Sequence, residues 1–176
     1  GGELPVVIVT GSGNQGITAS VPVIRYAKHI GASDERLYRA LLVSDLVTIH
    51  QKTGIGRLSA YCGAVSAGGG AGAGIAYLLG GDYRAIAHTI VNAVAILSGT
   101  ICDGAKPSCA AKIASAVEAG ILGYYMYVND QQFRGGDGIV AKGVENTIRN
   151  VGLLASQGMK QTDRVILNIM TGDQCL

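Results

Sequence analysis

Three cysteines are the residues of this chain whose type and spacing are best suited to chemistry. Cys62, Cys102 and Cys109 lie 40 and 7 residues apart, and a fourth cysteine, Cys175, stands next to the C-terminus. Three thiolates can hold a metal centre and leave one coordination position free for a substrate, as catalytic metal sites do. The spacing lacks the close cysteine pairs of structural zinc sites and the cysteine run of bacterial ferredoxins. Because free cysteine is also among the most buried residue types, three metal ligands and three core thiols both remain open.

The local context of two of these cysteines favours thiolate chemistry. Pro107 is well placed at the start of a helix, so Cys109 falls in its first turn, where the helix dipole stabilises a thiolate. Cys102 precedes an Asp-Gly turn, whose backbone N–H groups can hydrogen-bond to sulfur. Asp103 is either a residue that orients a group at this site or simply part of the turn.

A glycine-rich segment, Gly11-Ser12-Gly13-Asn14-Gln15-Gly16, is the second candidate site. It matches the dinucleotide fingerprint G-x-G-x-x-G, but the acids about 20 residues further on open a helix instead of ending a second strand. A nucleotide binder through Gly11-x-Gly13-x-x-Gly16 is therefore an alternative that the context disfavours. Exposed backbone N–H groups at the start of a helix suit a carboxylate or phosphate, although an ordinary glycine-rich turn has the same composition.

Hydrophobic periodicity and capping signals predict an all-α fold, a single domain of Gly/Ala-rich packed helices. The segment 4–9 is predicted to be a short strand or an extended entry segment. The many glycines of 58–79 require a packing reason, and close approach of neighbouring helices supplies one. The predicted helices are 17–30, 34–50, 58–79, 82–97, 108–117 continuing with a bend to 127, 140–156 and 162–169.

Composition excludes several classes of protein. The chain has 176 residues, 48% hydrophobic and 15% charged, with 27 Gly, one Phe, no Trp and a net charge of +2. This charge and the lack of a basic run with aromatics argue against a nucleic-acid partner. The stretch 58–81 carries no charge, but the glycines clustered between 68 and 74 and the missing aromatic belts make it a poor membrane span. With no visible signal peptide, we expect a cytoplasmic protein without disulfides.

Four segments carry a specific resemblance that covers essentially the whole chain. They are Gly11-Ser-Gly-Asn-Gln-Gly-Ile-Thr18, Arg57-Leu-Ser-Ala-Tyr-Cys62, Ile101-Cys-Asp-Gly-Ala105 and Ser108-Cys-Ala-Ala-Lys112, with Gln161-Thr-Asp-Arg164 near the end. The sequence resembles the L-cysteine desulfidase family, which is related to the α region of iron–sulfur L-serine dehydratases.

The resemblance implies an oxygen-sensitive [4Fe–4S] cluster on Cys62, Cys102 and Cys109, with a fourth iron open to substrate. It also implies that Ser12, Gly13, Asn14 and Gln15 hold the substrate carboxylate. The implied reaction is a lyase reaction that eliminates sulfide from L-cysteine and gives pyruvate and ammonia. Cys175 is expected to be an unligated bystander.

Members of that family are longer, so residues 1–176 are expected to be the C-terminal, α-type iron–sulfur catalytic domain of a longer protein. The missing N-terminal region is then the expected partner and the source of the unidentified general base, and this region alone is expected to be inactive. A homodimer stays open. The alternatives are an L-serine dehydratase of the same superfamily and, from another class, a cofactor-free helical binding or structural domain.

The remaining candidates for a functional role are weaker. Lys52 and Arg57, near the break before the Cys62 segment, could meet an anionic substrate, but solvated cations are the favoured prediction. His29, His50 and His88 lie within predicted helices, where a lone histidine is usually a satisfied surface or core residue.

Overall fold

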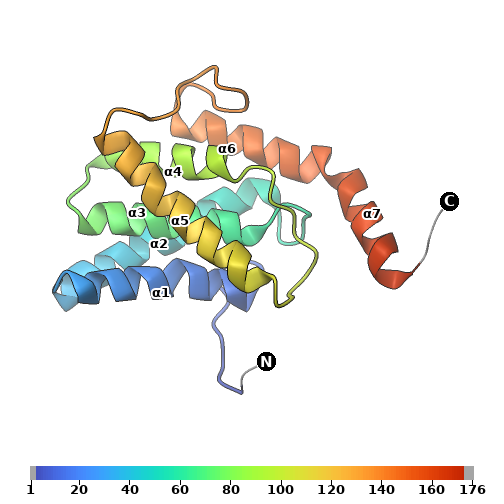
Figure 1. Cartoon of the computed structure of the whole chain (residues 1–176), viewed down its shortest axis with the longest axis horizontal. Coiled ribbons are helices and arrows are strands. Elements are labelled where there is room, and N and C mark those ends of the chain that lie inside the picture. Colours follow the sequence, from blue (N-terminus) through green and yellow to red (C-terminus); the bar gives the residue numbers. More distant parts are fainter. Residues whose placement is uncertain (1–2, 173–176) are drawn as a thin grey trace.

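The computed structural model describes residues 3–172 and is helical, as predicted (Figure 1). Within these residues the β structure is limited to one antiparallel bridge between Tyr61 and Ile101. The elements are α1 (Gly13–His29), α2 (Asp34–Ile55), α3 (Gly63–Leu78), α4 (Tyr83–Ile96), α5 (Cys109–Val128), α6 (Val144–Leu153), a π-helical turn (Leu154–Gly158) and α7 (Lys160–Thr171).

Helix α3 is the centre of the bundle. It packs against α1, α2, α4 and α5, and almost every one of its residues is buried. A Cβ placed on Gly72 would lie 2.6 Å from the Cα of Gly120 on α5, so the two backbones touch. On the side of α2, a Cβ on Gly74 would lie 2.8 Å from the carbonyl oxygen of Ala40. The close helix approach predicted from the glycines is therefore confirmed.

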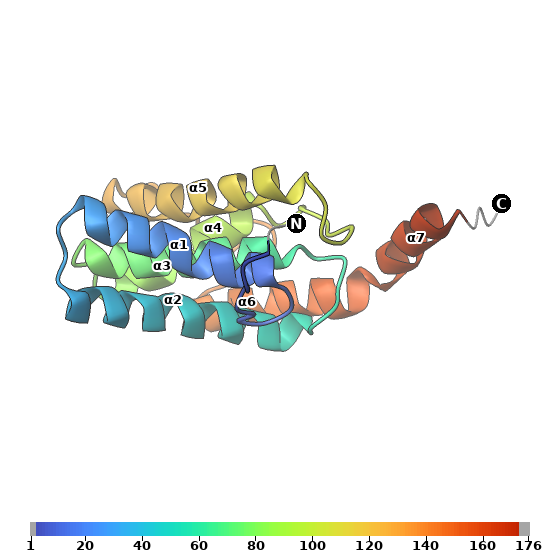
Figure 2. The same cartoon turned by 90° about the horizontal axis from the view of Figure 1, so that it is seen from below.

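Three of the packed helices share a direction that matters for the site. Figure 2 shows α1, α3 and α5 running in the same direction from one end of the bundle, the end at which α2 and α4 finish. Helix α7 extends away from the bundle in both views, and none of its described residues is buried (Figures 1 and 2).

Several element boundaries differ from the predicted ones. Helix α1 begins at Gly13, four residues early, so the second half of the glycine-rich segment is its first turn. Helix α3 begins at Gly63 instead of Leu58, because the preceding residues pair with the segment around Ile101. Helix α5 runs without a break from Cys109 to Val128. The segment 4–9 is irregular, not a strand.

Two disfavoured alternatives lack their structural context. No sheet precedes or follows the glycine-rich segment within residues 3–172, so the strand–turn–helix unit of a dinucleotide site is absent there. Gly16 serves packing instead, because a Cβ at this position would collide with the carbonyl of Val7. None of the described helices has the length and apolarity needed to span a membrane.

The contact between α3 and α5 yields a test of the fold. Replacing Gly72 with Ala should lower the free energy of unfolding by at least about 2 kcal/mol, since two backbones must move apart. Gly99→Ala is the matched control, because nothing lies within 4 Å of a Cβ there, and a change within about 0.5 kcal/mol is expected. Urea unfolding measures both; equal stabilities of the two variants would contradict the packing.

Candidate functional site

The N-termini of three helices meet at one cavity. Ser12 is the N-cap of α1, Cys62 is the N-cap of α3 and Cys109 is the first residue of α5, and all three line a cavity of about 210 Å³. A helix N-terminus carries about half a positive charge from its unpaired N–H groups. The cavity is therefore suited to thiolates and to an anionic ligand.

The bridge between two distant segments brings Cys62 and Cys102 together. The N–H of Cys62 donates to the carbonyl of Thr100 at 3.2 Å, and the N–H of Cys102 donates to the carbonyl of Ala60 at 2.6 Å. These bonds flank the Tyr61–Ile101 bridge, so the two cysteines are held side by side and their thiols hydrogen-bond.

The hydrogen bond makes the two thiols unequal. Its acceptor, Cys102, has its pKa lowered to about 6, and a backbone N–H of Gly104 and the ammonium of Lys112 act in the same direction. The same hydrogen bond and burial raise the pKa of Cys62 well above its usual range. At neutral pH Cys102 is therefore the thiolate of this pair and Cys62 the thiol that donates to it.

Cys109 lines the same cavity from the start of α5. Its sulfur accepts from the backbone N–H of Lys106 at 3.4 Å and lies 3.4 Å from the carbonyl of Gly104. The turn before α5 therefore fixes the side chain, as the position of Pro107 in the sequence suggests.

An ion pair closes the loop between Cys102 and Cys109. Lys112, one turn into α5, donates to the carboxylate of Asp103 at 2.7 Å and to the carbonyl of Ile101 at 3.0 Å. Each partner shifts the other's pKa, lowering that of Asp103 and raising that of Lys112. Of the two roles left open for Asp103, this contact supports the orienting one.

The glycine-rich segment contributes three of its four candidate residues to the cavity. Ser12, Asn14 and Gln15 line it, whereas Gly13 does not. The Ser12 hydroxyl makes no capping bond, so it is available to a ligand. The carbonyl oxygen of the buried Gln15 side chain already accepts from the Thr10 hydroxyl and from the Gly11 N–H. Gln15 thus braces the segment.

Lys52 is a functional candidate whose environment the sequence did not reveal. It lines the cavity with only 6% of its surface exposed, so the expectation of a solvated cation is wrong for Lys52, whereas Arg57 is exposed as expected. Burial lowers the pKa of the Lys52 ammonium, opposed by the nearby Cys102 and Cys62. The described residues offer this ammonium no carboxylate partner. The local sequence around Lys52, near the end of α2, does not indicate that the residue is buried. The burial results from tertiary packing.

The three thiols that line the cavity are donors of the kind that a metal cluster uses. Among the described residues, no three His, Cys, Asp or Glu side chains are close enough together to hold one metal ion, and Cys175 lies outside those residues. Three thiols nevertheless converge on one cavity that the described carboxylates do not line. Tyr61, which also lines it, has a buried hydroxyl oxygen without a hydrogen-bond partner. The cavity therefore has sulfur ligands, cations and an unsatisfied donor.

A family model described as the serine dehydratase alpha chain matches residues 1–168. The chain belongs to this family. The resemblance seen in the cysteine and glycine-rich segments is thereby confirmed at the level of the family. No solved structure matches the chain.

Relatives in this family are longer than the chain. A UPF0597 protein of Desulfitobacterium hafniense is 69% identical over 175 residues, which are 99% of this chain and 40% of that protein. A UPF0597 protein of Lachnoclostridium phytofermentans is 55% identical over 170 residues, or 97% of this chain and 41% of that protein. The chain thus spans about two fifths of the curated relatives it matches.

The unequal thiols predict an order of chemical reactivity. In reduced, metal-free protein at pH 7, iodoacetamide should modify Cys102 before Cys62, because only a thiolate reacts and the pKa of Cys102 is the lowered one. Lys112→Gln removes a charge that helps to lower this pKa, so the modification of Cys102 should slow several-fold. Peptide mass spectrometry at timed intervals measures the rates. Lys106→Gln, which changes an exposed lysine of the same loop, is the control; Cys62 reacting first would contradict the arrangement.

Proposed function

We propose that the chain is the iron–sulfur catalytic domain of a longer L-cysteine desulfidase, a lyase that converts L-cysteine and water to pyruvate, ammonia and sulfide. The observation that carries the proposal is the convergence of Cys62, Cys102 and Cys109 with the start of α1 on one cavity. The family match supports the superfamily, and the substrate is our inference.

Cys62, Cys102 and Cys109 would hold a [4Fe–4S] cluster. Three protein ligands leave one coordination position free, which is how a metal site meets a substrate. When bound, the cluster supplies a Lewis acid that withdraws electron density from the substrate. The cations Lys52, Arg57 and Lys112 line the same cavity and balance the negative charge of three thiolates.

The substrate carboxylate would lie at the N-terminus of α1. The free hydroxyl of Ser12, the amide of Asn14 and the unpaired N–H groups of the first helical turn all suit a carboxylate. Gln15 keeps this turn in place through its bonds to Thr10 and Gly11. Lys52 adds a buried positive charge, which is worth more away from water than at the surface.

The base that removes the α-proton of the substrate would come from the N-terminal region of the longer protein. No histidine or carboxylate of residues 3–172 lines the cavity. In this proposal, residues of this chain bind the metal cluster and the substrate carboxylate. The N-terminal region of the longer protein removes the proton. Loss of the α-proton and of HS⁻ leaves aminoacrylate, which water hydrolyses to pyruvate and ammonia.

Metal analysis tests the ligand assignment. Anaerobically reconstituted full-length protein should contain about four iron and four sulfide per chain, as a [4Fe–4S] cluster requires, and absorb visible light. Cys102→Ser and Cys109→Ser should lose most of the iron, because each removes one of three ligands. Cys175→Ser is the matched control and should retain it. Unchanged iron content in Cys102→Ser would refute the assignment of this ligand. No iron in the wild-type protein would refute the cluster and leave the cofactor-free helical domain.

Parallel assays test the substrate and the division of labour. Pyruvate formation by the reconstituted full-length protein should be at least about tenfold more efficient with L-cysteine than with L-serine, with sulfide released in equal amount; about 1.4 kcal/mol of transition-state discrimination suffices. The 176-residue chain alone should bind iron yet form no pyruvate. A preference for L-serine, the candidate that the family's description favours, would replace the desulfidase by a dehydratase.

A further inference from the structure

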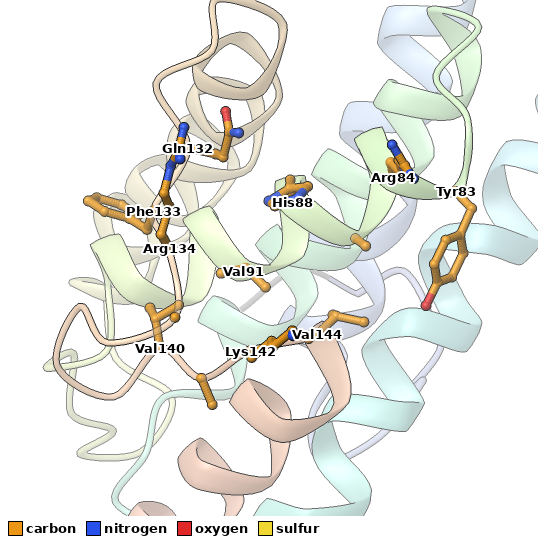
Figure 3. Close-up of a pocket in the computed structure, with 14 residues that line it drawn as sticks. Tyr83, Arg84, His88, Val91, Gln132, Phe133, Arg134, Val140, Lys142 and Val144 are labelled. Atoms are coloured by element: carbon orange, nitrogen blue, oxygen red, sulfur yellow. The ribbon is translucent and has the colours of Figure 1, made fainter.

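A second cavity, of about 470 Å³, lies between the first half of α4 and the loop that leads into α6. It shares no lining residue with the cysteine cavity. Figure 3 shows Arg84 and His88 on α4, with Gln132 and Arg134 on the facing loop and Lys142 close to Val144, where α6 begins. This size is typical of a pocket for a small organic ligand.

The charged residues that line this second cavity are all basic. Arg84, Arg134 and Lys142 line it, and no Asp or Glu of the described residues does. The side chains of these three cations have no hydrogen-bond or ion-pair partner in the described part of the chain. Asp137 is no exception, because its carboxylate accepts from the backbone N–H of Arg134 and leaves the guanidinium free. The cavity therefore presents three unpaired positive charges.

Two buried polar atoms in the lining also lack partners. They are Nδ1 of His88 and Oε1 of Gln132. The His88 ring is fixed by stacking on Tyr127, with centroids 5.1 Å apart, and Nε2 of Gln132 donates to Asp130 at 3.4 Å. An amide carbonyl can only accept, so Oε1 of Gln132 requires a donor such as a hydroxyl group. Buried polar atoms are nearly always paired. Oε1 of Gln132 has almost no exposed surface, so a ligand in the cavity would reach it only after this half-buried side chain turns.

The walls of the cavity are fixed before any ligand arrives. The fully buried Asn92 on α4 donates to the carbonyl of Gly123 at 2.9 Å and accepts from the N–H of Phe133 at 3.0 Å. At the other end of the loop, the buried Thr147 hydroxyl bonds to both the N–H and the carbonyl of Ala141. Both ends of the loop are therefore held by hydrogen bonds to helices. Binding a ligand would then cost little conformational entropy, because the loop backbone is already ordered.

We propose that this second cavity binds a hydroxylated phosphate ester. Three cations match the double negative charge of a phosphate, and arginine in particular bonds phosphate in a bidentate manner. A hydroxyl group of the ligand donates to Oε1 of Gln132 once this half-buried amide turns toward the cavity, and Val91 and Phe133 contact its carbon skeleton. The N-terminus of α6, at Gly143 and Val144, adds unpaired N–H groups to the same wall. Arg84, Arg134 and Lys142 are each exposed, so it is their grouping at one cavity without a lining carboxylate that favours an anion.

Titration of the 176-residue chain tests this site. Glycerol 3-phosphate, ribose 5-phosphate and AMP serve as probes in calorimetry and in ¹⁵N-resolved NMR, with inorganic phosphate and ribose as partial ligands. At least one ester should bind about tenfold more tightly than inorganic phosphate, since the hydroxyl contact adds one well-formed hydrogen bond. The amide shifts should centre on Phe133, Arg134 and Gly143. Arg134→Gln should weaken binding about tenfold by removing one charge-assisted contact.

The control variant is Arg25→Gln, on the exposed face of α1, which does not pack against α4 or α6. It should bind the probes as the wild-type chain does. Three results would overturn the proposal: no ester binding at millimolar concentration, shifts that centre on the cysteine cavity, or equal affinity in Arg134→Gln. If inorganic phosphate binds as tightly as every ester, the hydroxyl contact at Gln132 is wrong and with it the ester assignment. Unchanged thermal melting of each variant excludes unfolding as the cause.

Discussion

The contact between α3 and α5 is the constraint on which the rest of the structure depends. Gly72 and Gly120 let the two backbones touch, and side chains at these positions would force them apart. Because the two helices run in the same direction (Figure 2), this contact helps to bring their N-termini to one cavity. The same glycines that cost helix propensity thus position Cys62 and Cys109 at one cavity.

Parallel N-termini have an electrostatic consequence. Aligned helices normally keep like ends apart or neutralise them, yet α1, α3 and α5 begin at one cavity that the described carboxylates do not line. Thiolates and a bound carboxylate offset the three partial positive charges. The buried ammonium of Lys52 adds to the positive field, and burial alone would favour its neutral form. Without an anion, these positive charges repel one another and raise the free energy of the folded state. A site that binds anions is expected to have this property.

The elements of the fold could be predicted from the sequence more completely than the site. Helix periodicity, the cap at Ser33 and the position of Pro107 are local signals, and α2 and α5 begin where these signals indicate. The bridge that pairs Tyr61 with Ile101 is a contact across 40 residues, and it moves the start of α3 to Gly63. No local pattern contains that information, because two distant backbone segments make the bonds.

The site residues also fall into two groups, those that local sequence identifies and those that only tertiary contacts reveal. The cysteines and the glycine-rich segment could be chosen because their types are suited to ligation and anion binding, whatever their surroundings. Lys52 could not, because a lysine near a helix end is usually solvated and only packing against α3 and the Cys102 segment buries it. The role of Gln15 was likewise hidden, since its amide bonds to Thr10 and Gly11 and not to the cavity alone. Chemistry that resides in a residue type can be predicted from sequence, whereas chemistry that burial creates requires the fold.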